Sequence, residues 1–424
     1  MPRRRHLLAG ATAALLAGCA GDAESSPAPP DAAPPASDAT ARGYTHQRPT
    51  GNRLVAGRGS LPGTDPVDVA VSGTPTWIVG VPAADASAWA VVTEAGDVTG
   101  VHLDGRSVDR FRLDPDSLPR GAPPMLSGGD PPRVAKAPAA DASTLTHPVP
   151  VAGGRVYLAE GGDLVLWSGS EVDRVAVDAP RDARIVTADG RAYVLADATD
   201  RYEHAVIGDG VEGGSVAVID ATDGLAVEGR VVPPGAGVVE GLSPLLADVT
   251  GDGTRDILVT VSGDGGGARL AAYRPDGTRV ATGPTLGAGW RHQLAVAPFG
   301  PGAIPEIAAV RMPHVAHELQ FVRRTDDELR VVASATGYRS HVIGSRNLDA
   351  ALAGDLDGDG TPEVLLPTTG RDTLAAVRRT DDGAEEVWTV PVGGDLSTNV
   401  GAVDAAGGVT VAAGHEGGVR FWPG

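Results

Sequence analysis

The stretch GDLDGDGTPEVLLP at residues 354–367 places four carboxylates within nine positions and then continues into an apolar segment. At this density Asp355, Asp357, Asp359 and Glu363 repel one another unless a positive charge lies among them. A bound cation would supply that charge, because Ca²⁺ takes hard oxygen ligands from alternate residues of a tight loop and glycine permits the turn. The stretch therefore predicts a cation-binding loop between two short strands.

The same pattern recurs upstream, as LLADVTGDGTRDILVTV at residues 245–261 and LAVAPFGPGAIPEIAAV at residues 294–310. Aligned on the acid that ends each loop, Asp256, Glu306 and Glu363, the copies are 50 and 57 residues apart. Each copy reads as strand, glycine-rich loop, acid and strand. A period near this length is typical of β-propeller blades.

Short apolar runs separated by Gly, Asp and Pro turns continue from residue 49 to the end of the chain, and no amphipathic helix is evident. We therefore expect an all-β fold, a β-propeller of seven blades with four antiparallel strands each, and six or eight blades remain alternatives. The expected inner strands lie near residues 67, 148, 184, 245, 294, 350 and 400. The last blade shows only three strands, so we expect residues 53–57 to supply its fourth, because an open edge strand would be exposed to pairing.

The loops at residues 248–256 and 355–363 resemble the loops of FG-GAP or VCBS-type repeats. The resemblance is clear over residues 240–370 and faint elsewhere. It implies a β-propeller whose loops bind calcium, and it says little about activity.

Ca²⁺ requires six to eight oxygen ligands, and the two loops offer different numbers of carboxylates. The second loop offers Asp355, Asp357, Asp359 and Glu363, with the Thr361 carbonyl between them. The first loop offers Asp248, Asp252 and Asp256, with Thr250 and the Thr254 carbonyl. We expect one or two Ca²⁺ ions, bound more weakly in the first loop. Asp/Gly-rich hairpin turns without an ion remain the alternative, and the copy at 298–306 has lost its acids.

The amino terminus predicts export. Three arginines at residues 3–5 precede a short apolar run, and residues 16–19 read LAGC, which resembles a lipobox whose Cys19 is lipidated. We therefore expect a lipoprotein signal peptide at 1–19, a disordered Ala/Pro/Asp-rich tether at 20–48 and the propeller at 49–424. The protein should be extracytoplasmic, at the cell surface or in the periplasm, and anchored to the membrane. Twin-arginine and general secretory export both remain open.

The composition of the chain argues against two classes of function. The formal net charge of -19 argues against a nucleic-acid partner, whose phosphates would be repelled. Cys19 is the single cysteine, so its lipidation would leave no thiol for a disulfide or for catalysis. His314 and His317 are a weak metal-ligand pair, because a strand would turn residues three apart to opposite faces.

Bulky polar residues recur where the chain enters the expected inner strands, and they suggest a ligand funnel at the channel mouth. These residues are His147, Arg291, His292, Arg346, Asn347 and Asn399. The resulting hypothesis is a surface-tethered, calcium-stabilised, non-catalytic module that binds a protein or glycan. The alternative is an extracytoplasmic propeller enzyme of lyase, hydrolase or dehydrogenase type, with its site at the channel mouth.

Overall fold

The computed structural model describes Ser37 and residues 39–84, 86–202, 204–263, 265, 267–285, 287, 289–405 and 407–424. They belong to one compact unit, Ala32–Gly424, and their regular structure is all β-strand. The signal peptide, Cys19 and most of the expected tether lie outside the described residues. Within the described part of the chain, no helix is long and apolar enough to cross a membrane.

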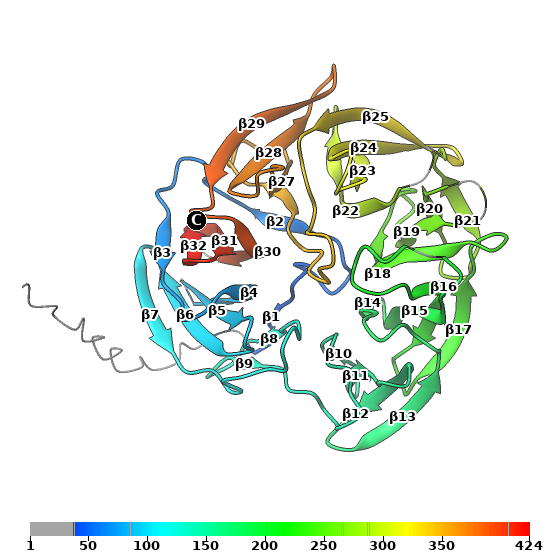
Figure 1. Ribbon diagram of the computed structural model, residues 1–424, viewed down its shortest axis with the longest axis horizontal. Helices are drawn as coiled ribbons and strands as arrows, with labels where there is room; N and C mark the ends of the chain where they lie inside the picture. Colours follow the sequence, from blue (N-terminus) through cyan, green and yellow to red (C-terminus); the bar gives the residue numbers. More distant parts are fainter. Residues whose placement is uncertain are drawn as a thin grey trace, which may run out of the picture. The chain divides into compact units, whose positions relative to one another are not determined.

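Antiparallel pairing groups the described strands into seven successive sets of four, and Figure 1 shows these blades in a ring. The first blade consists of β4 (Pro75–Ala83), β5 (Ala86–Thr93), β6 (Val98–Asp104) and β7 (Ser107–Phe111). The second consists of β10 (Val149–Val151), β11 (Gly154–Leu158), β12 (Asp163–Trp167) and β13 (Glu171–Ala176), and the third of β14 (Val186–Ala188), β15 (Arg191–Thr199), β16 (Glu212–Asp220) and β17 (Ala226–Val231). The fourth consists of β18 (Val238–Ala247), β19 (Asp256–Ser262), β20 (Arg269–Tyr273) and β21 (Arg279–Thr282). The last three are β22 (Arg291–Gly300), β23 (Ile304–Arg311), β24 (Glu318–Thr325) and β25 (Glu328–Thr336); β26 (Leu352–Asp355), β27 (Glu363–Pro367), β28 (Thr373–Arg379) and β29 (Ala384–Pro391); and β30 (Leu396–Ala405), β31 (Gly408–His415), β32 (Gly418–Trp422) and β3 (Val67–Val69). The predicted all-β propeller is confirmed.

A small separate sheet joins residues 42–43 to the stretch between the first two blades. It pairs β1 (Arg42–Gly43) with β8 (Leu126–Ser127) and β8 with β9 (Arg133–Val134). This sheet accounts for the irregular, proline-rich stretch that follows the first blade.

Burial explains why the strands differ in sequence. The second strand of a blade is packed between its neighbours, so every residue of β5 and of β19 is buried and most of them are apolar. The outermost strands face solvent on one side, and β25 accordingly alternates between exposed and less exposed residues. The apolar core is therefore distributed between blades.

The ring closes through β3, which pairs antiparallel with β32, Val67 opposite Phe421 and Val69 opposite Val419. The expectation that residues 53–57 close the last blade is wrong. Those residues belong to β2 (Leu54–Arg58), which runs parallel to the inner strand β26. The expected inner strand near residue 67 is also wrong, because β3 is an outer strand and β4 is the inner strand of the first blade.

Residues 42–58, which we call the axial segment, cross the middle of the ring beside the inner strands (Figure 1). The segment hydrogen-bonds to the inner strands of five blades, and these bonds join Gln47 to Val400 and Ala402, Thr187 to Pro49, Leu246 to Thr50, Asn52 to Val296, and Ala353 to Arg53. It thereby satisfies backbone groups on the open edges of these strands.

The folded region begins before residue 49, the start expected from the sequence. Tyr44, Thr45 and His46 are at most 4% exposed, and the ring of Tyr44 lies 5.6 Å from that of His147 in front of the second blade. These side chains are buried because they pack in the middle of the ring, a space that the side chains of the inner strands do not fill.

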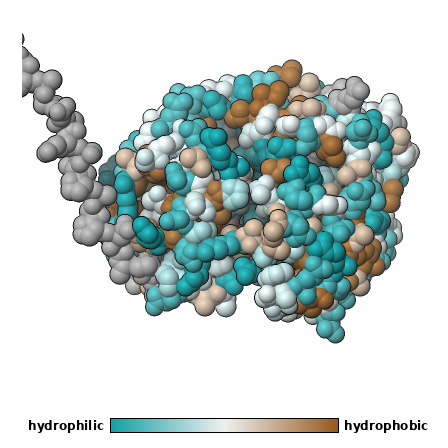
Figure 2. All heavy atoms as spheres, turned by 60° about the horizontal axis from the view of Figure 1, so that its bottom comes forward, coloured by the Kyte–Doolittle hydropathy of each residue, from teal (hydrophilic) through white to brown (hydrophobic). Residues whose placement is uncertain are grey.

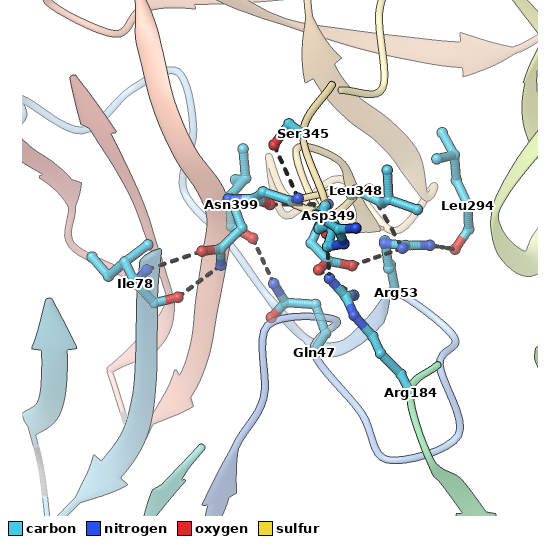
Figure 3. Close-up of polar contacts among 12 residues, drawn as sticks. Gln47, Arg53, Ile78, Arg184, Leu294, Ser345, Leu348, Asp349 and Asn399 are labelled. Atoms are coloured by element: carbon cyan, nitrogen blue, oxygen red, sulfur yellow. Dashed lines mark hydrogen bonds and ion pairs between the residues drawn. The ribbon is translucent and has the colours of Figure 1, made fainter. Parts of the chain in front are cut away.

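A buried carboxylate joins the axial segment to the blades (Figure 3). Asp349, fully buried in front of β26, lies 2.7 Å from Arg53 Nη2 through one oxygen and 2.5 Å from Arg184 Nη1 through the other. Burial alone would raise the pKa of Asp349, but the two guanidinium groups hold it well below its usual range. Asp349 is therefore ionised in the core.

Candidate functional site

The loop between β26 and β27 gathers three of the predicted calcium ligands. Carboxylate oxygens of Asp355, Asp357 and Asp359 lie within 4.8 Å of one another, and no other group of three Asp, Glu, His or Cys side chains in the described residues does so. Amides of the loop hold them in place, with Gly360 donating to Asp355 (3.1 Å) and Thr361 donating to Asp359 (2.9 Å). The donor set is the hard-oxygen set that Ca²⁺ prefers.

Arg378 brings a positive charge among the same carboxylates. Its guanidinium lies 2.9 Å from Asp357 and 2.8 Å from Asp359, and it also contacts Glu363, which is opposite it across the β27–β28 pair. Burial raises the pKa of Glu363 to about 7 against the effect of this contact. The sequence reasoning missed Arg378, although an arginine at the end of the third apolar run of the blade was a usable signal.

Two further groups complete the surroundings of this loop. Arg58 of the axial segment lies 3.1 Å from Asp355, and the indole nitrogen of Trp388 donates to Asp357 (3.2 Å). Because β2 runs beside β26, the loop is also a contact between the sixth blade and the axial segment.

The loop between β18 and β19 is organised differently. Asp248 accepts the amides of Gly251 and Gly253, both at 2.7 Å, and the Thr250 hydroxyl donates to it as well (3.1 Å). Asp252 accepts the Thr254 amide (2.9 Å) and pairs with Arg274. The carboxylates of Asp248, Asp252 and Asp256 do not gather as those of the other loop do.

The acid that ends each of the three repeats has a structural role of its own. Asp256, Glu306 and Glu363 are at most 1% exposed, and each lies against an arginine at the end of the third strand of its blade. These arginines are Arg274, Arg323 and Arg378. The repeat is therefore a strand, loop and strand closed by a buried acid–arginine pair, and Glu306 keeps it although its loop has lost the other acids.

Two of the expected funnel residues fasten the ring. Asn399, fully buried, accepts from the Ile78 amide (2.9 Å) and donates to the Ile78 carbonyl (2.7 Å), joining the seventh blade to the first (Figure 3). Asn347 donates to the Thr76 carbonyl (2.9 Å). The amide side chains are thus used within the protein.

The other four expected funnel residues are buried or bonded to other parts of the chain. Arg346 lies 2.7 Å from Asp182 and 2.6 Å from Asp209, and Arg291 donates to the Ala268 carbonyl. His147 and His292 are each 3% exposed. The arginine and asparagine side chains of the predicted funnel thus bond to other parts of the chain, whereas His292 Nδ1 and His147 Nε2 are buried without a hydrogen-bond partner among the described residues.

Two cavities flank the axial segment on the face where the predicted calcium loops open. The larger, of about 300 Å³, is lined by residues that include Arg48, Thr50, Asn52, Asp248 and Arg255. The smaller, of about 190 Å³, lies between the axial segment and the first and seventh blades. The sequence reasoning missed this face, because the path of the axial segment was unknown.

A pair of buried carboxylates lies on the opposite face, between the third and fourth blades. Glu212 and Glu240 flank the cross-strand pair of Gly213 and Val239, and both are 2% exposed. Glu240 lies 2.6 Å from His204 Nδ1 and accepts from Ser262 (2.8 Å). Burial and the nearby Glu240 raise the pKa of Glu212 to about 9, so Glu212 carries a proton at neutral pH.

Comparison with known proteins supports the fold. No family model and no curated protein matches the chain. Among solved structures, quinohemoprotein alcohol dehydrogenase ADHIIG from Pseudomonas putida HK5 aligns with a TM-score of 0.53 at 10% identity, over 90% of this chain and 76% of its own. BamB from Moraxella catarrhalis aligns with a TM-score of 0.42 at 12% identity, over 87% of this chain and 97% of its own. At 10% identity, the likeness to the alcohol dehydrogenase shows the β-propeller fold and nothing more.

The raised pKa of Glu212 predicts a pH dependence of stability. Between the usual pKa of 4.5 and about 9, the folded chain keeps a proton that the unfolded chain has lost. The stability that this group contributes is therefore complete below pH 4.5 and is lost as the pH rises through 9. Glu212→Gln, which keeps the protonated shape, should raise the free energy of unfolding near pH 9 by at least about 1.4 kcal/mol, the equivalent of one pKa unit.

Denaturant unfolding at pH 5, 7 and 9 measures this effect. The gain over the wild type should shrink toward pH 5, and the exposed control Glu94→Gln should change little at any pH. A Glu212→Gln variant that is equally destabilised at all three pH values would contradict a protonated Glu212.

Proposed function

We propose that this chain is an exported, lipid-anchored, calcium-stabilised β-propeller that binds a protein or glycan without catalysing a reaction. The observation that carries the proposal is the filled axis. The axial segment and the polar side chains around it occupy the middle of the ring, where a propeller would otherwise offer a deep pocket. The hollows that remain flank this segment on the loop face.

The larger hollow suits a polar ligand. Its lining includes the guanidinium groups of Arg48 and Arg255 and the carboxylate of Asp248. Arg255 also pairs with Asp189 (2.6 Å) and Arg48 donates to the Leu54 carbonyl (3.0 Å), so a ligand would share or displace these contacts. A volume of about 300 Å³ is at the lower end of small-molecule sites, so a peptide loop or a sugar unit reaching in from a larger partner fits better than a buried cofactor. In the view of Figure 2, hydrophilic residues cover much of the surface and apolar ones are scattered among them.

The second candidate function is an enzyme with its site on the opposite face. Glu212 and Glu240 favour it, because a carboxyl group with a raised pKa beside a second carboxylate can act as a general acid. Against it, both side chains are 2% exposed, and Glu240 is already engaged by His204 and Ser262. The buried and engaged carboxylates therefore support binding better than catalysis.

For calcium, the loop of the sixth blade is the stronger candidate. Asp355, Asp357 and Asp359 would hold the ion through their carboxylates, with the Thr361 carbonyl, and Glu363 would complete the set if it turned from Arg378. The ion would cancel the repulsion among these acids. Because Arg378 already does so in part, the ion and the guanidinium compete for the same oxygens.

Calcium should raise the melting temperature, and a chelator should lower it. An ion that binds only the folded chain stabilises it by about 2.7 kcal/mol at a hundredfold excess over Kd. Asp359→Ala should remove most of the calcium response, because it deletes one of the three clustered carboxylates. Asp252→Ala should remove a smaller part, whereas Arg378→Met should enlarge the response by removing the competitor.

The matched control is Glu306→Ala, in the repeat that has lost its other acids. It should lower the melting temperature in the absence of calcium, because it breaks the contact with Arg323, yet leave the calcium-induced rise unchanged. Melting curves that ignore the chelator at low ionic strength would refute the calcium assignment, as would a Glu306→Ala variant as insensitive to calcium as Asp359→Ala.

The anchor and the binding face can be tested together in intact cells. A photo-crosslinking residue replaces Arg255 in the larger hollow or, as the control, Val315, which is 71% exposed on the opposite face. Position 255 should yield a discrete adduct in the membrane fraction, position 315 should not, and Cys19→Ser should move the chain to the soluble fraction. Equal adducts from both positions would contradict the proposal that the partner binds at the larger hollow. A Cys19→Ser variant that stays with membranes would contradict the proposed lipid anchor.

A further inference from the structure

Two histidines far apart in the sequence meet on the face opposite the calcium loops. His314 lies in the loop between β23 and β24, and His341 lies in the loop between β25 and β26. Their Nε2 atoms are 3.0 Å apart, and their ring planes are nearly perpendicular, at 83°. The contact therefore joins the tips of the two rings.

Backbone hydrogen bonds hold the two loops together. The Met312 carbonyl accepts the amides of Val315, Ala316 and His317, and the His317 carbonyl accepts the amides of Gly337 and Tyr338 at 2.9 and 3.0 Å. The first set of bonds shapes the loop that carries His314, and the second attaches it to the segment that leads to His341. The two imidazoles are thus positioned before any ligand arrives.

The other ring nitrogens determine what the Nε2 atoms can do. His341 Nδ1 lies 3.0 Å from the Ser340 hydroxyl, and a partner at this nitrogen can keep the proton there and leave the Nε2 lone pair free. His314 Nδ1 is buried without a hydrogen-bond partner among the described residues. Without a cation, one Nε2 must donate to the other.

We propose that His314 and His341 bind a divalent first-row transition-metal ion, of the Zn²⁺, Ni²⁺ or Cu²⁺ class, through their Nε2 atoms. Imidazole nitrogen suits these metals, and metal–nitrogen bonds of about 2.0 to 2.1 Å place two ligand nitrogens about 2.9 Å apart at a right angle and about 3.4 Å apart at the tetrahedral angle. The observed separation of 3.0 Å lies between these values. The two nitrogens therefore already have the separation that a shared ion requires.

Further coordination positions remain open to water or to a donor from a partner. His314 is half-buried, so an ion can enter from solvent. Behind the pair, the His292 ring lies 5.4 Å from that of His341 and the Trp290 ring lies 5.0 Å from it. The site is therefore backed by rings and open on one side.

Electrostatics around the pair both help and oppose metal binding. Burial lowers the pKa of His314 to about 4 and that of His341 well below its usual value, so both rings are unprotonated at neutral pH and no proton has to be displaced. Burial is the main cause that lowers the pKa of His314 and of His317, and the nearby positive charge of Arg339 lowers both further. The same charge weakens a cation site, and this makes Arg339 a useful probe.

The test titrates the full chain with Cu²⁺ and Zn²⁺ in an excess of Ca²⁺, which occupies hard-oxygen sites. One equivalent of Cu²⁺ should bind and give an electron paramagnetic resonance spectrum with coupling to two imidazole nitrogens. His314→Ala and His341→Ala should each weaken binding at least tenfold, Arg339→Gln should strengthen it, and the distant control His102→Ala should leave it unchanged.

Melting curves keep the test decisive if a variant folds poorly. Zn²⁺ should raise the melting temperature of the wild type and of His102→Ala, and His314→Asn should abolish the rise while melting normally without metal. Wild-type chain without a two-nitrogen Cu²⁺ spectrum, or a His314→Asn variant that keeps the zinc response, would overturn the site. The contact would then be a hydrogen bond between neutral imidazoles.

Discussion

The ring depends on one buried carboxylate. Asp349 is fully buried with both of its oxygens engaged, one by Arg53 from the axial segment and one by Arg184 from the entry to the third blade. Its carbonyl accepts the Val400 amide of the seventh blade (2.9 Å). A charge in the interior is tolerated only when it is paired, and removing one partner typically costs about 3–5 kcal/mol. Asp349 therefore fixes the axial segment in the middle of the ring.

The same pairing of acid and arginine recurs at the edge of single blades. Asp256, Glu306 and Glu363 each end a loop, and each lies against an arginine at the end of the next strand of its blade. This recurrence helps to explain how a chain with a net charge of -19 folds with acids in its interior. In the sixth blade the arrangement also holds three aspartates beside Arg378, and there an ion and a side chain have overlapping roles.

Much of the fold could be predicted from the sequence, because middle strands buried on both sides are read directly as apolar runs. Six of the seven expected inner strands lie within two residues of observed ones. The wrong assignments, near residue 67 and at residues 53–57, concern short strands whose partners are more than 290 residues away. The local sequence pattern does not determine which strand, so far away in the chain, such a short strand pairs with. The start of the fold at residue 49 was placed too late because Tyr44 and His46 belong to no apolar run, and their burial depends on contacts far away in the sequence, such as that of Tyr44 with His147.

The contacts in the candidate sites also fall into those that are local in the sequence and those that are set by the fold. Asp355, Asp357 and Asp359 are close in the sequence, so their proximity could be predicted. Arg378 reaches them through strand register, and His314 meets His341 rather than His317 because two loops are joined by backbone hydrogen bonds. The role of the funnel residues in ligand binding stays a prediction, and the sequence could not show that Asn347 and Asn399 bond to the first blade.

Native-state hydrogen exchange tests most directly whether the axial segment holds the ring together. The amides of Thr187, Leu246 and Ala353 donate to Pro49, Thr50 and Arg53. In the wild type they should exchange as slowly as core amides such as Val259, and in Asp349→Asn all three should accelerate together while Val259 stays slower. If these amides exchange rapidly in the wild type, or keep their protection in Asp349→Asn, the account of a ring organised around Asp349 is contradicted.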